Sequence, residues 1–559
     1  MMAFRAGPII LIMMLSSPVF AQWEYGGKWI GNYTSGTGLA MLTDSVTGNT
    51  FVGWSKLNGG DYDIFIQCVD SAGYTLWDEG GMVVYEDDYY TQWYVSLLLD
   101  GEGGVFVVWT DYRNTPNEGA ELYGQRISGR GGLLWDAEGM KLTGDSTGHT
   151  DPQLYSDGQS GFVAVYINHI NSGDIWAQRV NSNGQMLWDS TGISLTTANY
   201  LQYTPKTCRS SDSTFITIWV DWRDSHDYDS DIYMQSFDLE GNVLWATNGV
   251  PAVHWIEHQG YLDRGHDVVA DGQGGAVVVW VDHRLDYIGY PVLFADRFSA
   301  QGESMWQANG KQLGFEDSNR AIGCQVCRMG HGFLFVWLGS LVGFEATYTN
   351  EFGDFIWEDT VQVLDSHPAA GNLVMADSDS LLVYVSSSQE GGMHKFGSKV
   401  DITGNQYWPN EPFLENFPDL IQVALDGQGG MIAAWKNLET SDIEISRIYA
   451  DGHVGGDTNT VVEENPDLSI PGEFTLFQNY PNPFNGQTVL EYYSASATPM
   501  TFQVFDILGR EAYCATIVRN HIGTNILMLD LGHLHSGIYI ARIKNFNSRS
   551  NYITMTLIK

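Results

Sequence analysis

The sequence predicts an all-β protein whose body is an eight-bladed β-propeller, followed by a small immunoglobulin-like β-sandwich. Three observations support this. A four-stranded pattern recurs along most of the chain, and glycine-rich turns separate its short apolar runs. The 559 residues include 63 glycines and 13% aromatic residues but only 17% charged residues. Such a composition is typical of an ordered protein rich in strands and turns.

The repeating unit is clearest in Ser96 to Leu142. A first strand leads into the turn DGEGG, and a second strand, VFVVW, ends at Trp109. A third strand, LYGQRI, is followed by a turn and by a fourth strand that carries Trp135. Apolar runs of this length between glycine turns predict an antiparallel meander.

Variants of this unit fill the body. The second-strand pattern recurs eight times, at residues 51–54, 106–109, 162–166, 215–219, 276–280, 333–337, 381–384 and 431–435. Tryptophans of the third-to-fourth hairpin are 51 to 61 residues apart. Four strands in about fifty residues are typical of a propeller blade, whereas a sandwich has no such period. Because the sixth and seventh units are degenerate, seven blades remain the alternative.

The eighth unit lacks a hairpin tryptophan. Residues 442–456 read DIEISRIYADGHVGG, whereas the segment Gln22–Ile30, QWEYGGKWI, matches LWDEGGMVV of the first unit. We therefore expect the N-terminal strand, residues 22–30, to complete the last blade and close the ring, which removes an exposed sheet edge. The alternative is a partial repeat that lies loose at the terminus.

The ends of the chain indicate export. Residues 1–21 have a basic start, an apolar run and a small-residue cleavage site, as a signal peptide does. We expect a propeller at 22–456, a polar linker at 457–473 and a C-terminal domain at 474–559. No later stretch is long enough to span a membrane. The net charge of −40 disfavours nucleic acid as a partner, and we expect a monomer.

The tail carries motifs of a known family. These are QNYPNPFN (Gln478–Asn485), VFDILGRE (Val504–Glu511), LDLGHLHSGIYIARI (Leu529–Ile543) and the terminal Lys559. In these segments the tail resembles the C-terminal sorting domain of type IX (Por) secretion substrates. The resemblance implies recognition by that machinery in a Gram-negative bacterium, with the protein secreted or held on the outer surface.

Candidate chemistry is sparse. The pattern Asp-x-Arg follows three second-strand tryptophans, at Asp111, Asp221 and Asp282, and such repetition favours structure over catalysis. The loop 221–231 places Asp224, Asp227, Asp229 and Asp231 at spacings that make it a candidate calcium site, although the favoured interpretation is a solvated acidic loop. Cys324 and Cys327 form one CxxC in a predicted strand, where buried apolar packing is expected rather than a metal.

No motif of a nucleophile, a catalytic zinc or a phosphate loop is present. The sequence therefore favours a non-catalytic binding or display protein, with a glycan or protein ligand at the propeller loops and no cofactor except the candidate calcium. Two alternatives remain open: an extracellular hydrolase acting on polysaccharide or peptide, and a structural component of a surface layer. A single-copy cluster of acids that lines the channel, at carboxylate separations suited to hydrolysis, would favour the hydrolase.

Overall fold

The structure is a computed structural model. It describes Trp23 and residues 27–33, 38–87, 89–114, 119–144, 147–170, 173–223, 230–253, 265–282, 284, 291–313, 321–339, 343–357, 361–364, 368–374, 380–389, 392–401, 404–405, 408, 414–415, 421–437, 440–455, 474–476, 485, 487–494, 500–506, 510–517, 523–532, 534–544, 550–557 and 559. The described residues form strands and turns and contain no α-helix. Among them, no helical segment meets the length and hydropathy that crossing a membrane requires.

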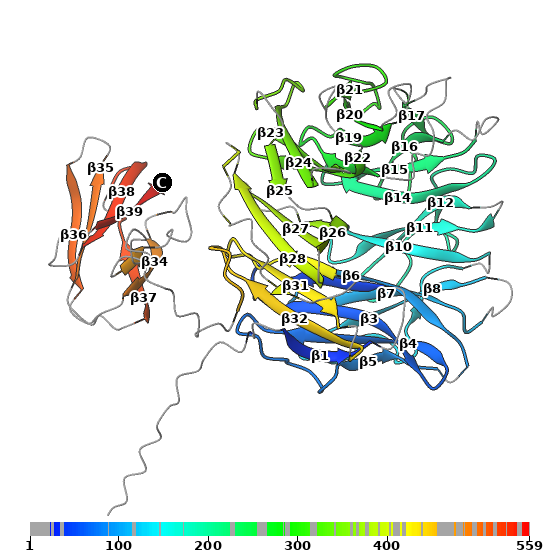
Figure 1. The fold of residues 1–559 in the computed structure, drawn as a ribbon, viewed down its shortest axis with the longest axis horizontal. Coiled ribbons are helices and arrows are strands. Elements are labelled where there is room, and N and C mark those ends of the chain that lie inside the picture. The colour runs from blue at the N-terminus through cyan, green and yellow to red at the C-terminus, as the bar shows by residue number, and fades with distance from the viewer. Residues whose placement is uncertain are drawn as a thin grey trace, which may run out of the picture. The chain divides into compact units, whose positions relative to one another are not determined.

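The chain divides into two compact units, residues 1–458 and 459–559. In the described part of the first unit, eight antiparallel sheets of four strands follow one another (Figure 1). The first seven each use four consecutive strands, because short turns join neighbouring strands of the meander.

We number these sheets in chain order and give the bounds of their strands here. Sheet 1 is β2 (Leu39–Thr43), β3 (Thr50–Asn58), β4 (Asp61–Val69) and β5 (Met82–Tyr85); sheet 2 is β6 (Gln92–Leu99), β7 (Val105–Asp111), β8 (Glu121–Ile127) and β9 (Met140–Lys141). Sheet 3 is β10 (His149–Ser156), β11 (Phe162–Asn168), β12 (Asp174–Val180) and β13 (Ile193–Ser194); sheet 4 is β14 (Gln202–Arg209), β15 (Thr214–Asp221), β16 (Asp231–Asp238) and β17 (Val250–Val253). Sheet 5 is β18 (His266–Ala270), β19 (Ala276–Asp282), β20 (Val292–Phe298) and β21 (Lys311–Gln312); sheet 6 is β22 (Ala321–Met329), β23 (Gly332–Gly339), β24 (Gly343–Asn350) and β25 (Val361–Leu364). Sheet 7 is β26 (Pro368–Val374), β27 (Ser380–Gln389), β28 (Gly392–Asp401) and β29 (Leu414–Glu415); sheet 8 is β30 (Ile421–Leu425), β31 (Met431–Lys436), β32 (Asp442–Ile448) and β1 (Lys28–Asn32).

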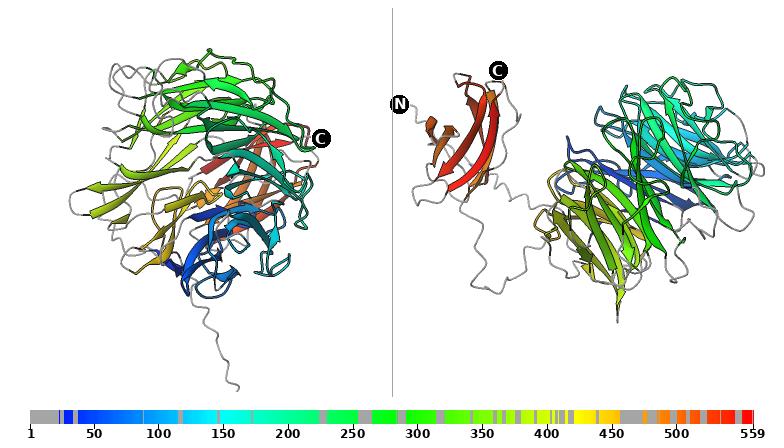
Figure 2. Two further views of the ribbon diagram at one scale, coloured as in Figure 1. Left: turned by 90° about the vertical axis from the view of Figure 1, so that its right-hand side faces the viewer. Right: turned by 90° about the horizontal axis from the view of Figure 1, so that it is seen from above.

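Sheet 8 joins the two ends of the body. Its outer strand is β1, which pairs antiparallel with β32 through Lys28 and Ile445. The N-terminal strand thus begins at Lys28 rather than at Gln22. Figures 1 and 2 show the blue start of the chain beside the yellow strands β31 and β32.

The first strand of each sheet is the inner one. Strands β2, β6, β10, β14, β18 and β22 contact one another in this order, and β30 contacts both β26 and β2. Apolar side chains of facing sheets fill the space between them. For example, one buried cluster joins Phe51 and Ile64 of sheet 1 to Val107 and Trp109 of sheet 2. No unit buries its apolar faces alone, so the sheets stabilise one another.

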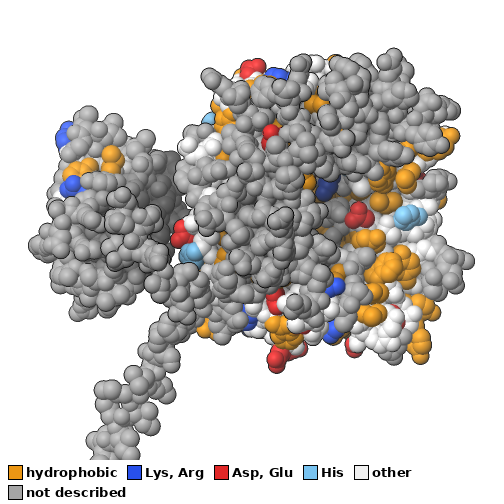
Figure 3. All heavy atoms as spheres, in the orientation of Figure 1, with side chains coloured by type: hydrophobic (Ala, Val, Ile, Leu, Met, Phe, Trp, Pro, Cys, Tyr) orange, Lys and Arg blue, Asp and Glu red, His pale blue; other side chains and the backbone are white. Residues whose placement is uncertain are grey.

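The hairpin tryptophans bridge neighbouring sheets. In six of them the indole Nε1 donates a hydrogen bond to a backbone carbonyl in the turn between the third and fourth strands of the next sheet. The pairs are Trp77 with Gly129, Trp135 with Ser182, Trp188 with Leu239, Trp245 with Ala300, Trp306 with Glu351 and Trp408 with Ala450, at 2.9–3.4 Å. The residue before several of these tryptophans is exposed, as Leu134 and Met305 are. Hydrophobic side chains are visible along the right-hand edge of unit 1 in Figure 3.

The second unit consists of two sheets. One has the order β33 (Phe474–Leu476), β34 (Gln487–Ser494) and β37 (Gly523–Asp530). The other has the order β36 (Glu511–Ile517), β35 (Met500–Asp506), β38 (Gly537–Lys544) and β39 (Ser550–Leu557). Leu490 of the first sheet and Phe502 and Met555 of the second belong to one buried cluster.

Candidate functional site

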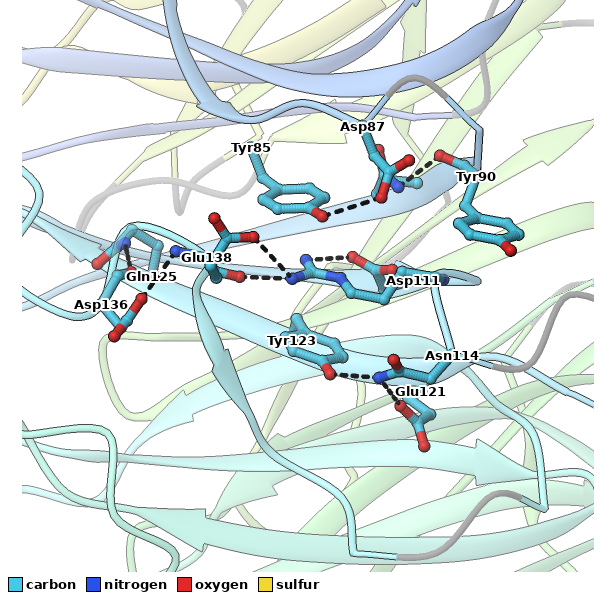
Figure 4. A network of polar contacts seen from close by, with 12 residues as sticks. Tyr85, Asp87, Tyr90, Asp111, Asn114, Glu121, Tyr123, Gln125, Asp136 and Glu138 are labelled. Atoms are coloured by element: carbon cyan, nitrogen blue, oxygen red, sulfur yellow. Dashed lines mark hydrogen bonds and ion pairs between the residues drawn. The ribbon is translucent and has the colours of Figure 1, made fainter.

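The repeated Asp-x-Arg motifs have structural partners. Asp111 accepts hydrogen bonds from the Nε1 of Trp109 at 2.8 Å and from the Arg113 guanidinium at 2.6 Å. The guanidinium carbon lies 3.5 Å from the ring centroid of Tyr85 and 4.0 Å from that of Tyr123. Figure 4 shows these two rings on opposite sides of the network that contains Asp111.

The same arrangement recurs around Asp221 in sheet 4 and Asp282 in sheet 5, where a tryptophan Nε1 donates to each carboxylate at 2.7 and 3.0 Å. Arginine–aspartate pairs are also repeated at the inner turns, at Arg126–Asp100, Arg179–Asp157, Arg297–Asp271 and Arg447–Asp426. A reaction needs one site, so these repeated pairs serve the fold.

The inner strands of three successive sheets carry β-bulges at one position. The register shifts between Trp93 and Ser96 in β6, between Thr150 and Gln153 in β10, and between Tyr203 and Lys206 in β14. In each bulge one non-glycine residue has a positive φ: Tyr94 at 52°, Asp151 at 55° and Thr204 at 50°. Bulges of this kind redirect side chains and are frequent beside functional sites.

These bulges lie at the end of the inner strands where the loops between second and third strands begin. Tyr112, which follows β7, donates its amide hydrogen to the carbonyl of Thr91, just before β6, at 3.2 Å. Trp222, which follows β15, bonds in the same way to Leu201, just before β14, at 3.0 Å. The bulged positions of sheets 2 and 4 are therefore next to the loops that vary most between repeats.

One charged cluster lies at these bulges and breaks the repeat. It consists of Asp151 on sheet 3, Lys206 on sheet 4, and His266 with Asp267 on sheet 5. Lys206 interacts electrostatically with the other three. The side chain of Lys206 is exposed and has no ion pair within 4 Å among the described residues. We call these four residues the inner acid cluster.

Backbone groups fix the cluster. Asp267 Oδ2 accepts a hydrogen bond at 3.1 Å from the amide of Val326, on sheet 6. His266 Nε2 lies 2.7 Å from the carbonyl oxygen of Thr204, so this nitrogen carries the proton and donates it. Gln153 donates to Asp151 at 3.2 Å. The cluster is thus held by strands of four sheets.

Burial determines the protonation of the cluster. It raises the pKa of Asp267 to about 6, against the opposing effects of the Val326 amide and the Lys206 charge. Burial likewise raises the pKa of Asp151, although the Gln153 hydrogen bond and Lys206 oppose it. Burial also lowers the pKa of His266 to about 4, which leaves that ring neutral at pH 7. Carboxyl groups that hold a proton near neutral pH are suited to general acid–base chemistry.

The sequence missed this cluster because no motif marks it. The only available signal is the alignment of the repeats on the inner strand. One register position on the inner strand can be compared across sheets 2 to 6. In each sheet the residue at this position pairs with the equivalent residue of the second strand. These residues are Ser96, Gln153, Lys206, Asp267 and Gln325. Oppositely charged residues at this one position in adjacent repeats would have identified it.

The predicted calcium loop is mostly untested. Asp224, Asp227 and Asp229 lie outside the described residues. Asp231 is buried at the start of β16, where it pairs across the strands with Asp221. Among the residues that the structure describes, no group of three acids, histidines or cysteines is arranged to hold a metal. The calcium site stays a prediction.

Cys324 and Cys327 are both buried and form no disulfide. They pack into different apolar clusters, on opposite faces of β22. Burial raises the pKa of the Cys327 thiol to about 12, which keeps it protonated. These two cysteines act as small apolar residues.

The comparisons with known proteins identify the tail. Residues 478–558 match the family model of the secretion system C-terminal sorting domain. The C-terminal segment is therefore a type IX sorting domain that interacts with the secretion machinery, and the protein is exported to the cell surface or the extracellular space. No curated protein matches the chain.

Several solved structures similar to this chain are described as enzymes that act on polysaccharides, and another as a prolyl endopeptidase. One is an ulvan lyase, described as a new family of polysaccharide lyase (11% identity, 77% of this chain and 96% of that chain covered, TM-score 0.39). Another is an endo-arabinase from Bacteroides thetaiotaomicron (16% identity, 51% and 99% covered, TM-score 0.28). A third is an arabinanase from Penicillium chrysogenum (11% identity, 58% and 98% covered, TM-score 0.33).

This comparison contradicts the main functional prediction from the sequence, a non-catalytic binding or display protein. That prediction rested on the absence of a local sequence motif. In a repeat fold the reacting groups come from several repeats, and their spacing in the sequence is about fifty residues. A local motif search does not detect such a site.

Proposed function

We propose that this protein is an extracellular polysaccharide-degrading enzyme of the hydrolase type, exported by the type IX route. One observation carries the proposal. The inner acid cluster occurs once among the described residues, in a body whose arginine–aspartate pairs are repeated from sheet to sheet. A catalytic site in a repeat protein is expected to be such a departure from the consensus.

The cluster has the groups that glycoside hydrolysis needs, two carboxyl groups, and burial raises the pKa of both. In this proposal Asp267, whose pKa is about 6, donates its proton to the glycosidic oxygen as the bond from that oxygen to the sugar carbon breaks. Asp151 acts as the ionised partner that stabilises the positive charge on the sugar. Water then supplies a hydroxyl group to the sugar carbon and returns a proton to the acid.

Elimination fits the cluster less well than hydrolysis. A lyase that removes a proton beside a uronate must first neutralise the negative charge of the substrate. Lys206 is the one cation of the cluster, and Asp151 and Asp267 oppose it when both are ionised. The site therefore lacks the excess of positive charge that a uronate requires.

The proposal includes the architecture. We propose an eight-bladed propeller at 22–456, closed by the N-terminal segment, after a signal peptide at 1–21. A linker at 457–473 then leads to an immunoglobulin-like sandwich at 474–559. The eight four-stranded sheets of the described residues and the chain of contacts between their inner strands support the blade number.

The test is an assay of the mature chain on a panel of soluble polysaccharides, with release of reducing ends as the readout. We expect the Asp267→Asn and Asp151→Asn variants each to lose at least about a hundredfold in rate, the contribution of one general acid or base. The matched control is Gln325→Ala, at the equivalent register position of sheet 6.

Two outcomes would contradict the proposal. Products with an unsaturated, ultraviolet-absorbing sugar would show elimination instead of hydrolysis. Wild-type rates in both aspartate variants would show that the inner acid cluster does not carry the reaction.

A further inference from the structure

Three aromatic side chains, an exposed one and two half-buried ones, pack together at the bulge of sheet 2, the neighbour of the sheet that carries Asp151. We call Trp93, Tyr94 and Tyr112 the aromatic surface. The centroid of the Trp93 ring lies 6.4 Å from that of Tyr94 and 5.9 Å from that of Tyr112, and both contacts are edge-to-face. Tyr62 of sheet 1 supports Trp93 from behind, at 6.1 Å. Edge-to-face packing of this kind fixes the orientation of the rings.

Tyr94 of the aromatic surface occupies, in sheet 2, the bulge position that Asp151 occupies in sheet 3. Tyr94 in sheet 2 and Asp151 in sheet 3 have the same left-handed backbone conformation at the same register position. The two bulges are also joined directly, because the Ser96 hydroxyl donates a hydrogen bond to the carbonyl of Pro152. A ligand that reaches Asp151 would therefore meet Tyr94 one sheet away.

Tyr94 has a backbone conformation that is unfavourable for a tyrosine. A positive φ is unusual for a bulky residue and costs about 1–3 kcal/mol. The side chain remains 39% exposed, so burial of its ring does not fully offset this cost. A strained tyrosine that stays exposed is better explained by a ligand than by the core.

Sheet 4 repeats the arrangement on the other side of Asp151. Tyr203 and Trp222 stand at the positions of Trp93 and Tyr112, and both are partly buried against the neighbouring core. Asp151 of sheet 3 is thus flanked by aromatic positions in both adjacent sheets. Flanking aromatic rings would hold units of a chain on both sides of the carboxyl group.

We infer that the aromatic surface binds an uncharged polysaccharide chain by stacking against its sugar rings, with cleavage inside the chain; this inference rests on the proposed function. Aromatic rings provide flat apolar area at low entropic cost, and sugar rings present apolar C–H faces. The charge balance selects an uncharged ligand. The protein carries a net charge of −40, and the inner acid cluster is not cationic. A polyanion would be repelled both by the net charge of the protein and by the carboxylates of the inner acid cluster.

The experiment measures binding separately from cleavage. The probes are soluble arabinan, xylan, galactan and mixed-linkage glucan, compared with polygalacturonate, and binding to the mature Asp267→Asn chain is followed by calorimetry. We expect at least one uncharged polymer to bind and Tyr94→Ala to weaken it about tenfold, the ratio that corresponds to about 1.4 kcal/mol. Tyr94→Phe, which keeps the ring, is expected to restore most of the affinity.

The matched control is Phe352→Ala, since Phe352 is an equally aromatic and more exposed side chain in a distant turn of sheet 6. Equal affinity of Tyr94→Ala and wild type, preference for polygalacturonate, or binding of none of the four uncharged polymers would overturn the inference. Cleavage without a Tyr94 effect would leave the proposed hydrolase in place and remove only the aromatic surface. If Tyr94→Ala weakens binding but the wild type cleaves no polymer, the aromatic surface is supported and the proposed hydrolase is contradicted.

Discussion

The indole Nε1 of Trp23 donates a hydrogen bond to the backbone carbonyl of Ser71 at 3.0 Å. Arg447 reaches the same carbonyl at 3.2 Å. Trp188 and Arg179 share the carbonyl of Leu239 in the same way. Trp23 therefore fills, for sheet 8, the place that the hairpin tryptophans fill in the other sheets, although it comes from the opposite end of the body.

Replacing Trp23 is expected to destabilise the body. The side chain is 1% exposed, and removal of a buried tryptophan costs about 3–5 kcal/mol. Chemical denaturation of Trp23→Ala should show this loss. Trp29→Ala is the control, since Trp29 lies on the same N-terminal segment but is 36% exposed. If the two variants unfold at the same denaturant concentration, Trp23 does not stabilise the contact between sheets 8 and 1.

The inner acid cluster predicts a pH dependence of the rate. If Asp267 must be protonated to act, the rate falls as the pH rises through about 6, the pKa of that group. The positive charge of Lys206 favours the ionised carboxylate and thus lowers this pKa. Lys206→Met should therefore move the falling limb of the pH–rate profile to higher pH. A limb that stays in place, or moves to lower pH, would remove Asp267 from the role of acid.

Asp174 predicts a pH dependence of stability. It is fully buried, and neither carboxylate oxygen has a hydrogen-bond partner among the residues that the structure describes. Burial, together with the Asp221 charge, raises its pKa to about 6. In sheet 2 the corresponding Glu121 pairs with Lys141, whereas sheet 3 has Ser194 at the position of the lysine. The carboxylate of Asp174 therefore lacks a cation.

Because the folded pKa is raised, the contribution of Asp174 to stability is full below about pH 4 and is lost as the pH rises through about 6. We expect the melting temperature of Asp174→Asn to depend less on pH between 4 and 7 than that of wild type. The difference corresponds to roughly 2 kcal/mol, since one pKa unit is about 1.4 kcal/mol. Asp189→Asn, at an exposed position, should follow wild type at every pH.

Arg113, which stacks against Tyr85 and Tyr123, is expected to matter for folding and not for catalysis. Arg113→Ala leaves the carboxylate of Asp111, which is 1% exposed, without its cation. Removing one partner of such a pair costs about 3–5 kcal/mol. Arg130→Ala, at an exposed position, should cost less than about 0.5 kcal/mol. Equal unfolding midpoints of the two variants would show that the stack contributes little.

The repeats made most of the body readable from the sequence. Four strands recur at an even spacing, and the mismatch between the eighth unit and residues 22–30 pointed to the pairing of β1 with β32. The sorting domain was readable because its motifs are local. The predicted strand bounds were less accurate. β1 begins at Lys28 and not at Gln22, because the start of a strand depends on pairing with its neighbour and not on composition alone.

The candidate site was not readable because its residues are remote from one another. Asp151, Lys206 and Asp267 are each unremarkable in their own segment. They meet only because inner strands of successive sheets lie side by side. Their raised or lowered pKa values come from burial, which a local motif does not encode. Tyr94 was visible as an aromatic residue, but its left-handed backbone was not.

The pairing of β1 with β32 also dictates an order of events. Trp29 contacts Asp442, which lies 413 residues later in the chain. During synthesis and export the start of the chain emerges first, yet its partner strand emerges almost last. The partner of β1 is therefore made only after the strands of the other seven sheets. A chain halted before Asp442 would leave β1 without its partner strand, so sheet 8 forms only once the last strand of the body is present.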